Sequence, residues 1–224
     1  MFKPCIFFFS GVDGSGKSTH AKLLRVYARK KGLKVRYMWL RWSPFLTYIL
    51  LFYSLIRRRT LKITFTRRGR RYTFKVHVFW IDPVLKTLYP RVFLFDSLLR
   101  YLLELVSSYM GHLDLIIFDR FFLDIIIDLL WETRNTAVFR YIEVKAVLGL
   151  LNKYKHCGLV LFADPLMIIN RKADVISFRE IKFKCNVFKL LTRVLNLEAI
   201  DTTSVSISEA FNIVVRRFHE CVHE

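Results

Sequence analysis

The chain has 224 residues, of which 54% are hydrophobic and 25% charged, and it carries a formal net charge of +19. The hydrophobic share is enough for a folded core and excludes an intrinsically disordered chain, and the length fits a single α/β domain. The longest apolar run, Pro44–Ile56, covers 13 residues. Because a membrane-spanning helix needs about 20 such residues, we expect no transmembrane segment.

Positive charge is concentrated in one third of the chain. Residues 14–81 contain 18 lysines and arginines and no carboxylate, whereas residues 82–224 are nearly balanced. A field of this kind attracts polyanions, which include nucleotides, nucleic acid and acidic membrane surfaces. A solvated basic face is the alternative interpretation, and charge alone does not separate the two.

The four cysteines are Cys5, Cys157, Cys185 and Cys221. None belongs to a Cys-x-x-Cys pair or has a zinc-type spacing with histidine, so the sequence supports neither a disulfide framework nor a structural metal. Reduced thiols in a cytoplasmic protein are the simplest expectation. The apolar stretch Met1–Phe9 runs into a glycine-rich motif without a small-residue cleavage site, so we expect a buried strand there rather than a signal peptide.

Strand-like and helix-like segments alternate along the chain. Short apolar runs typical of buried parallel strands occur at Cys5–Ser10, Lys34–Leu40, Leu113–Phe118, Leu159–Ala163 and Ala199–Asp201. Helices are expected at Lys17–Lys31, Phe45–Ile56, Arg91–Tyr109, Phe122–Trp131, Ala137–Lys153, Pro165–Lys172, Phe178–Leu195 and Ser206–Cys221. This alternation predicts an α/β fold in which a five-stranded parallel sheet has helices on both faces.

The segment Arg57–Trp80 interrupts the alternation. Two stretches with the every-second-residue pattern of strands lie on either side of a glycine, and both are rich in arginine and lysine. This pattern predicts a basic β-hairpin, residues 57–80, inserted beside the main sheet.

The strongest motif of the chain is glycine-rich and follows the first expected strand. Residues 11–18 match Gly-x-x-x-x-Gly-Lys-Ser/Thr, with a strand before and a helix after, which is the context of a P-loop. Its backbone N–H groups and the helix N-terminus bind the phosphates of ATP. Lys17 is expected to reach the β- and γ-phosphates, and Ser18 to bind Mg²⁺. The expected ATP-binding residues are Gly11, Val12, Asp13, Gly14, Ser15, Gly16, Lys17, Ser18 and Thr19.

An acidic and a basic residue end the third expected strand. Asp119 would lie on the ligand side of an open α/β sheet, where it can hold Mg²⁺ directly or through water. Arg120 can bind a second phosphate with its planar guanidinium group. The alternative for Asp119 alone is a helix N-cap. Together with the P-loop, the pair predicts a P-loop NTPase that transfers a phosphoryl group, with Lys17 and Arg120 as catalytic cations.

Two of these motifs resemble those of the thymidylate kinase family. The segment Phe8–Thr19 looks like the P-loop of that family, including Asp13 two residues after the first glycine. The sequence Asp-Arg-Phe at residues 119–121 resembles the family's Asp-Arg-Tyr/His signature. The order of motifs agrees over essentially the whole chain, with the basic hairpin as an insertion.

Two further segments resemble a divergent, mostly archaeal, branch of the family. These are Leu40–Pro44 and the Arg-Lys-x-Asp sequence that begins at Arg171, which follows a strand similar to the one that leads to the family's lid. The resemblance implies one nucleoside-monophosphate-kinase-like domain over residues 1–224 that uses ATP, Mg²⁺ and a nucleoside monophosphate. It implies conversion of dTMP to dTDP and a homodimer formed through helices that flank the acceptor site, for which Arg91–Tyr109 and Phe122–Trp131 are the candidates.

The resemblance also implies roles in the acceptor site. Asp13 would meet the sugar 3′-hydroxyl, Arg41 the acceptor phosphate, and Phe93 would stack on the base, a contact worth about 1–3 kcal/mol. The alternative for Asp13 is a turn residue that bonds its own backbone. The alternative for Phe93 is an ordinary core residue. The lid would span residues 169–180, with Arg171 as first choice for a catalytic arginine and Arg179 as second, because Gly14 stands where some members carry theirs. A solvated helix end is the alternative for Arg171.

The chain departs from the family at two places. Ser97 follows Asp96 where the family usually has an arginine, and Arg100, one turn further on, is the expected substitute at the acceptor. Isoleucines occupy residues 125–127, where the family often has an amide contact to the base, and Asp124 is the candidate replacement. Specificity for thymine is therefore left open.

Two other functions remain open at this level. The first is a kinase for another nucleotide or deoxynucleoside. The second is a nucleotide-binding protein without kinase activity that binds nucleic acid or an acidic membrane surface through the basic residues 14–81, where aromatic residues lie among the arginines. Weak contact with nucleic acid would also be compatible with a kinase.

Overall fold

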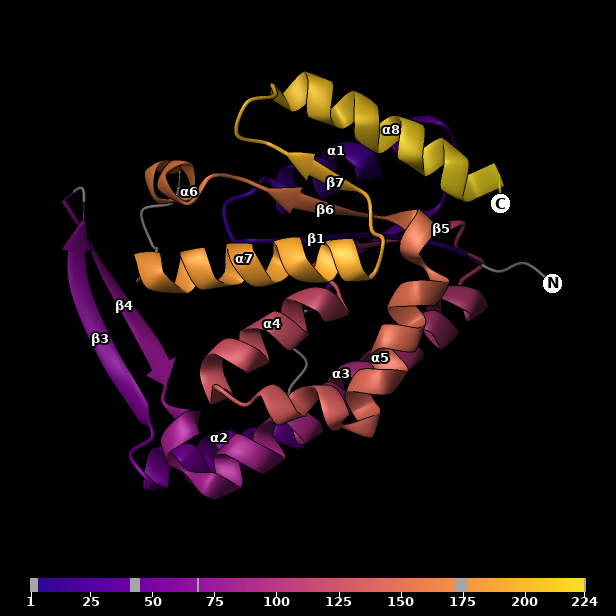
Figure 1. The fold of residues 1–224 in the computed structure, drawn as a ribbon. Helices are drawn as coiled ribbons and strands as arrows, with labels where there is room; N and C mark the ends of the chain where they lie inside the picture. Colours follow the sequence, from indigo (N-terminus) through magenta and orange to yellow (C-terminus); the bar gives the residue numbers. More distant parts are fainter. Residues whose placement is uncertain (1–3, 41–44, 68, 172–176, 224) are drawn as a thin grey trace.

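A computed structural model of the chain describes residues 4–40, 45–67, 69–171 and 177–223. A five-stranded parallel sheet with the order β2-β5-β1-β6-β7 forms its centre, and helices cover both faces, as expected from the sequence (Figure 1). A separate two-stranded antiparallel sheet projects from one end of the molecule.

The elements lie close to the bounds expected from the sequence. The strands are β1 Cys5–Gly11, β2 Val35–Trp39, β3 Thr60–Arg67, β4 Arg70–His77, β5 Leu115–Asp119, β6 Gly158–Phe162 and β7 Ala199–Asp201. The α-helices are α1 Lys17–Lys30, α2 Thr47–Ile56, α3 Pro83–Met110, α4 Phe122–Thr133, α5 Ile142–Lys153, α6 Pro165–Arg171, α7 Phe178–Val194 and α8 Ile207–His223. Short 3₁₀ helices are η1 Phe79–Ile81, η2 Thr136–Arg140 and η3 Lys155–Cys157.

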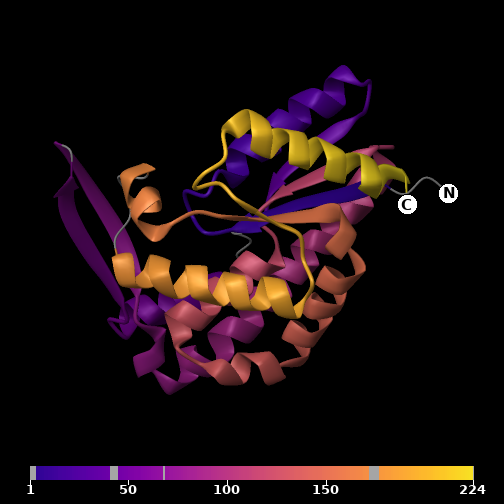
Figure 2. The same ribbon diagram turned by 45° about the horizontal axis from the view of Figure 1, so that its top comes forward.

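The central strand β1 divides the core into two layers. Because successive side chains of a strand point to opposite faces, Phe7 and Phe9 pack against α1 and α8, whereas Ile6 and Phe8 pack into the larger core under α3, α4, α5 and α7. Figure 2 shows α1 and α8 together on one face of the sheet and the remaining long helices on the other. The unbroken apolar sequence of β1 is therefore explained by burial on both faces.

The sheet order brings the two predicted phosphate motifs together. β1 lies between β5 and β6, and Phe9 is the register partner of Asp119. Since the carboxyl ends of parallel strands meet at one edge of a sheet, the loop after β1 and the Asp119-Arg120 pair after β5 lie side by side.

The inserted hairpin is present and forms its own sheet. β3 and β4 pair over eight residues each, from Thr60 opposite His77 to Arg67 opposite Arg70. Its base is attached to the rest of the protein by Asp82, whose carboxylate lies 3.4 Å from Arg57 and 3.9 Å from Arg59. The hairpin extends on the same side of the molecule as α6 (Figures 1 and 2).

One predicted helix is longer than expected. α3 begins at Pro83, eight residues before the predicted start at Arg91, and continues through Pro90. Asp82 caps its N-terminus by accepting hydrogen bonds from the backbone N–H groups of Val84 and Leu85 at 3.0 and 3.2 Å. A proline normally interrupts a helix, so Pro90 concealed the first turns from a sequence-based assignment.

Another predicted helix is divided. The segment expected as one helix over Ala137–Lys153 consists of η2 and α5, separated at Tyr141, whose backbone is extended (φ −70°, ψ 141°). Asn135 caps η2 through a 3.1 Å hydrogen bond from the backbone N–H of Ala137.

The expectation of four reduced thiols is wrong. Cys157 and Cys221 form a disulfide, and Cys5 and Cys185 are free. The two bridged residues are 64 positions apart in the sequence, and they meet because the end of α8 packs on η3. Their spacing matches no local motif, so only the fold brings them together.

No helix within the described part of the chain is both long and apolar enough to cross a lipid bilayer.

Candidate functional site

The loop after β1 has the backbone of a phosphate-binding turn. Gly11 has φ +142°, and a Cβ atom at this position would lie 2.1 Å from the carbonyl oxygen of Leu161 on the neighbouring strand. Only glycine fits there, because the conformation and the space both exclude a side chain. Gly16, with φ +95°, precedes the first residue of α1, so the helix N-terminus and its free N–H groups open into the loop.

Lys17 lies folded inside this loop. Its Nζ donates hydrogen bonds to the carbonyl oxygens of Gly11 at 2.6 Å and Val12 at 2.8 Å. The same ammonium group is 3.7 Å from a carboxylate oxygen of Asp13 and 3.8 Å from one of Asp124. Burial, together with the nearby charge of Arg120, lowers the pKa of Lys17 from 10.5 to about 8, and the surrounding carboxylates limit the shift.

Two cations and two carboxylates form a compact cluster at the loop. Arg120 makes a salt bridge with Asp13, and another of its nitrogens is 3.8 Å from Asp124. Asp124 is 98% buried, and burial raises the pKa of its carboxyl against the opposing influence of Lys17 and Arg120. Such a cluster of partly buried charges offers cations to an anionic ligand once the carboxylates are displaced.

The backbone at Arg120 turns its side chain toward the loop. This residue has φ +73°, a left-handed conformation that is uncommon for residues other than glycine. Its N–H donates to the carbonyl oxygen of Phe9 at 2.9 Å, which extends the pairing between β5 and β1 by one residue. The strained conformation at the end of β5 is typical of a functional position.

Asp119 supplies an oxygen of the kind that Mg²⁺ prefers. Its Oδ2 accepts a 2.5 Å hydrogen bond from the hydroxyl of Tyr37 on β2, while its Oδ1 is buried and has no hydrogen-bond partner among the described residues. Burial, and then the bond to Asp119, raises the pKa of Tyr37, which is also within hydrogen-bonding reach of Ser18. Ser18 and Asp119, the two predicted metal ligands, are therefore brought to the same place, and the free Oδ1 fits a cation.

The P-loop opens into a pocket. This pocket has a volume of about 440 Å³ and contains most of the predicted ATP-binding residues, Gly14 to Thr19, together with the predicted catalytic Arg120 and Arg171. The beginning of α8 and the loop before it form the opposite wall. The residues of this wall are Thr202, Val205, Ser206, Ile207 and Ala210.

Arg171, at the end of α6, is tied to the wall of this pocket. Its guanidinium donates to the carbonyl oxygen of Thr202 at 2.7 Å and to its hydroxyl oxygen at 3.1 Å. The Thr202 hydroxyl lies within hydrogen-bonding distance of the carbonyl oxygen of Ser15, at 3.1 Å. Thr202, which the sequence did not indicate, thus connects the predicted lid arginine with the P-loop.

A second pocket, of about 260 Å³, lies between the inserted hairpin and helices α3 and α4. Phe93 and Tyr89 on α3 form an aromatic wall, with ring centroids 5.7 Å apart. The hairpin contributes Lys75 and His77. The remaining lining residues are Trp39, Ile125, Asp128, Leu129 and Glu132.

A narrow gap of about 10 Å³ lies between the two pockets. It shares Arg120 with the P-loop pocket and Asp128 with the second pocket. The first three P-loop residues, Gly11, Val12 and Asp13, line this gap rather than the larger pocket. Asp13 and Arg120 therefore face the region that separates the two candidate ligand sites.

Several predicted residues lie elsewhere. Arg41, and residues 172–176 of the predicted lid, are outside the described residues, and the second-choice Arg179 is exposed on α7. Arg100 is half-buried on α3 and lines neither of the two pockets described above nor the gap between them. Ser97, in the family's arginine position, is buried and donates a 2.7 Å hydrogen bond to the carbonyl oxygen of Phe93.

Asp124 does not take the role expected for it. The sequence suggested a contact with the acceptor base, but its carboxylate faces Lys17 and Arg120 at the P-loop. It also accepts a 3.2 Å hydrogen bond from the N–H of Phe121 at the start of α4. Arg120 precedes α4, so no helical spacing relates it to Asp124, and only the fold places the two side chains together.

Comparison with known proteins was made by family, by sequence and by structure. No protein family profile and no curated protein sequence matches the chain. Among solved structures, thymidylate kinase from Candida albicans matches with a TM-score of 0.58 and 17% identity, over 99% of this chain and 94% of that one. Thymidylate kinase from Ehrlichia chaffeensis matches with a TM-score of 0.51 and 14% identity, over 96% of this chain and 98% of that one.

Both matches extend over nearly the full length of each chain, and the five-stranded parallel sheet with its P-loop follows the same plan. The sequence has thus diverged far from these two proteins while the architecture is retained. The chain has the P-loop fold of the thymidylate kinases, a nucleoside-monophosphate kinase fold.

Proposed function

We propose that the protein is a nucleoside-monophosphate kinase that transfers the γ-phosphate of ATP to a nucleoside monophosphate, with dTMP as the preferred acceptor and dTDP as the product. The observation that carries the proposal is the pair of pockets on either side of Arg120 and Asp13, one built on the P-loop and one on the aromatic wall of α3. A phosphotransferase needs two such sites that share a cationic boundary.

The P-loop pocket would hold ATP. Residues Gly11 to Thr19 offer backbone N–H groups to the phosphates, and Lys17 would leave its intraloop hydrogen bonds to contact the β- and γ-phosphates. The apolar side chains of Val205, Ile207 and Ala210 suit the adenine ring.

Ser18 and Asp119 would hold the Mg²⁺ that accompanies ATP. The partnerless Oδ1 of Asp119 supports this assignment, and Tyr37 fixes the carboxylate by bonding its other oxygen. Bound Mg²⁺ neutralises negative charge on the phosphate oxygens. Tyr37 then acts as a positioning residue for the ligand pair.

The second pocket would take the acceptor nucleotide. Phe93 would stack on the base, Asp13 would bind the sugar hydroxyl, and Arg120 would bind the acceptor phosphate at the gap between the pockets. Arg41 and Arg100 are proposed as further phosphate ligands on the basis of the family resemblance alone. The base edge would meet Lys75 and His77 of the hairpin or Asp128 and Glu132 of α4, which is a set of groups that can discriminate between bases.

The transfer itself requires positioning and charge neutralisation. The acceptor phosphate oxygen is already anionic, so no general base is needed. Arriving phosphates would compete with Asp13 and Asp124 for Arg120 and Lys17, which frees both cations for the reaction. Arg171, within the proposed lid over residues 169–180, would add positive charge on the side of the ATP phosphates.

The proposal is tested by measuring ADP formation with ATP, Mg²⁺ and a panel of acceptors that includes dTMP, dUMP, dCMP and UMP. We expect turnover with dTMP to exceed turnover with the others. Lys17→Ala should reduce kcat/KM by roughly 10²–10³-fold or more, whereas Lys22→Ala, an exposed lysine on the same helix, should leave it unchanged. Turnover that is indifferent to Lys17→Ala would exclude the proposed site.

The acceptor pocket has its own test. Phe93→Leu should raise KM for the nucleoside monophosphate about tenfold by removing base stacking, while KM for ATP stays the same. Equal rates across the acceptor panel would exclude dTMP as the preferred acceptor and favour another nucleotide or deoxynucleoside. Absence of turnover with every acceptor, combined with salt-dependent binding of nucleic acid or anionic vesicles, would favour the non-enzymatic alternative.

A further inference from the structure

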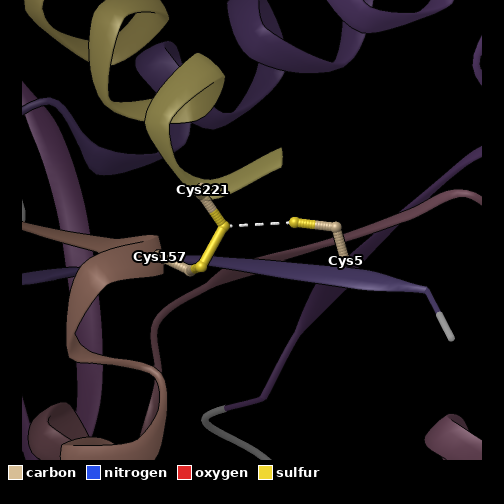
Figure 3. A group of neighbouring side chains, drawn as sticks. All are labelled: Cys5, Cys157 and Cys221. Atoms are coloured by element: carbon tan, nitrogen blue, oxygen red, sulfur yellow. Dashed lines mark hydrogen bonds between the residues drawn. A yellow bond between two sulfur atoms is a disulfide. The ribbon is translucent and has the colours of Figure 1, made fainter. Parts of the chain in front are cut away.

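Three of the four cysteines meet at the end of the sheet opposite the P-loop (Figure 3). Cys157 and Cys221 form the disulfide, and the sulfur of Cys5 lies 3.1 Å from that of Cys221. All three sulfur atoms are within 4.8 Å of one another. The fourth cysteine, Cys185, is buried on α7 and is not part of this group.

The three residues come from three different elements. Cys5 is the first residue of β1, Cys157 is the last residue of η3, directly before β6, and Cys221 lies near the end of α8. Figure 3 shows the side chain of Cys221 descending from α8 between the other two, so that Cys221 contacts both partners. Cys221 is buried, whereas Cys5 and Cys157 are half-buried.

A free thiol in contact with one sulfur of a disulfide is the arrangement from which thiol–disulfide exchange proceeds. Exchange starts when a thiolate attacks a disulfide sulfur, and it produces a new disulfide and a new thiol. The sulfur that Cys5 contacts belongs to Cys221, the member of the bridge shared by both possible pairings.

We propose that Cys5, Cys157 and Cys221 form an intramolecular thiol–disulfide exchange site in which Cys221 is bridged alternately to Cys157 and to Cys5. In the forward step Cys5 loses its proton and its sulfur attacks that of Cys221. The Cys5–Cys221 bond forms, the Cys157–Cys221 bond breaks, and the bonding electron pair leaves with Cys157, which takes up a proton. One disulfide and one thiol are present before and after, so the step requires no oxidant or reductant.

Exchange would change the partner of α8 without releasing the helix. In one state the end of α8 is tied to the turn before β6, and in the other to the start of β1. The beginning of the same helix lines the P-loop pocket, and β1 leads directly into Gly11. Either bridge therefore anchors the helix whose opposite end forms one wall of that pocket.

Exchange is expected to be slow near neutral pH. Burial raises the pKa of the Cys5 thiol from 9.0 to about 11, so only a small fraction is present as the reactive thiolate. Incubations should extend over hours, and the reaction should be stopped by acid before the bridges are mapped.

The first test maps bridges in the unmodified protein. The full chain, purified without reductant, is incubated with iodoacetamide, stopped with acid and digested for mass spectrometry. We expect molecules that carry a label on Cys157 and a Cys5–Cys221 bridge. Labelling of Cys5 alone, with Cys157 bridged to Cys221 in every molecule, would overturn the proposal.

The second test uses variants. Under mild oxidation with oxidised glutathione, Cys157→Ser should form the Cys5–Cys221 bridge, Cys5→Ser should form only the Cys157–Cys221 bridge, and Cys185→Ser should behave like the unmodified chain. The same oxidation conditions should close the Cys157–Cys221 bridge in Cys5→Ser. If folded Cys157→Ser keeps Cys5 and Cys221 as free thiols under these conditions, the exchange proposal is contradicted. Three reduced thiols that retain zinc in the purified protein would instead identify a metal site and overturn the proposal.

Discussion

Asp124 holds a buried carboxylate oxygen 3.8 Å from the ammonium nitrogen of Lys17, and the same oxygen is 3.8 Å from the guanidinium of Arg120. A carboxylate beside an anion-binding loop opposes the binding of phosphate, so its presence needs a reason. In the nucleotide-free protein it compensates two neighbouring cations, the buried Lys17 and the half-buried Arg120, that would otherwise repel each other. This contact therefore links the stability of the free protein to the chemistry of the site.

We expect Asp124→Asn to destabilise the free protein by about 1–3 kcal/mol, because the buried Lys17 and the half-buried Arg120 lose part of their compensation. Saturating ATP should reduce the difference in unfolding free energy between the wild type and the variant, since the triphosphate supplies the missing negative charge. Urea unfolding with and without ATP measures both effects. If the loss of unfolding free energy in the variant is the same with and without ATP, the Asp124 carboxylate stabilises the fold but has no link to nucleotide binding. Asp114, half-buried on the loop before β5, accepts a 2.7 Å hydrogen bond from the backbone N–H of Lys34 and provides a comparison residue at which ATP should have no effect.

The glycine that begins the P-loop should be irreplaceable. Gly11→Ala would place a Cβ 2.1 Å from the carbonyl oxygen of Leu161 in a backbone conformation with φ +142°, so the loop or the strand must move. We expect a loss of more than about 3 kcal/mol in unfolding free energy and loss of ATP binding. Gly32→Ala is the matched control, because Gly32 also has a positive φ (+84°) but no atom near the new Cβ, and it should cost only about 1 kcal/mol. Similar losses for both variants would refute the steric argument.

His77 should make stability depend on pH. Burial, with a smaller contribution from the charge of Lys75, lowers the pKa of His77 from 6.5 to about 4 in the folded protein. Between pH 6.5 and 4 the unfolded chain therefore takes up a proton that the folded chain refuses, and stability falls as the pH is lowered through this window. Above pH 6.5 His77 is neutral in both the folded and the unfolded chain, so it causes no loss of stability there.

The measurement compares the wild type with His77→Gln in the absence of nucleotide. The shift corresponds to a loss of up to about 3 kcal/mol between pH 6.5 and 4 in the wild type that the variant should lack. The His77 side chain contacts Thr60 at 3.0 Å and stacks on Phe79, and glutamine can retain the first contact but not the second. The variant is thus expected to be less stable than the wild type at pH 7, but its unfolding free energy should change less between pH 6.5 and 4. If the unfolding free energies of the wild type and the variant fall in parallel with pH, a titration of His77 is ruled out as the cause.

We expect the chain to form a homodimer through α2 and α3. Phe52 and Ile49 on α2 and Leu103 on α3 are 64%, 66% and 61% exposed, which is unusual for such large apolar side chains. Sedimentation at micromolar concentration should give a dimer for the wild type and a monomer for Phe52→Asp. Val194→Asp, on an equally exposed valine at the end of α7, should remain dimeric. A wild type that sediments as a monomer would disprove the expectation.

Local sequence patterns were sufficient for the strands and for most helices. β1 was recognisable because an apolar run leads into glycines at fixed spacing, and that spacing reflects a loop whose backbone must bend around a phosphate. α3 was shortened in the prediction because Pro90 is a helix breaker in most contexts, whereas here packing within the core retains it. The single helix predicted over Ala137–Lys153 failed for a different reason, since Tyr141 is extended although its sequence neighbours favour a helix.

The candidate site was only partly accessible to the same reasoning. Lys17, Ser18, Asp119 and Arg120 belong to motifs with a physical mechanism, so the sequence alone could name them, and their roles stay predictions. The contacts of Tyr37 and Thr202 could not be foreseen, because each lies on an element that reaches the site only through the order of strands in the sheet.

The sequence by itself determined that a phosphate-binding loop follows the first strand, that an acidic and a basic residue end a neighbouring strand, and that a basic hairpin interrupts the fold. These features depend on residues close together in the chain, whose conformations are set by local sterics and hydrogen bonding. Only the tertiary structure decided that Asp124 faces the P-loop, that the hairpin completes a second pocket, and that Cys221 contacts two other cysteines. Those contacts join residues distant in sequence, and the packing of helices on the sheet brings them together.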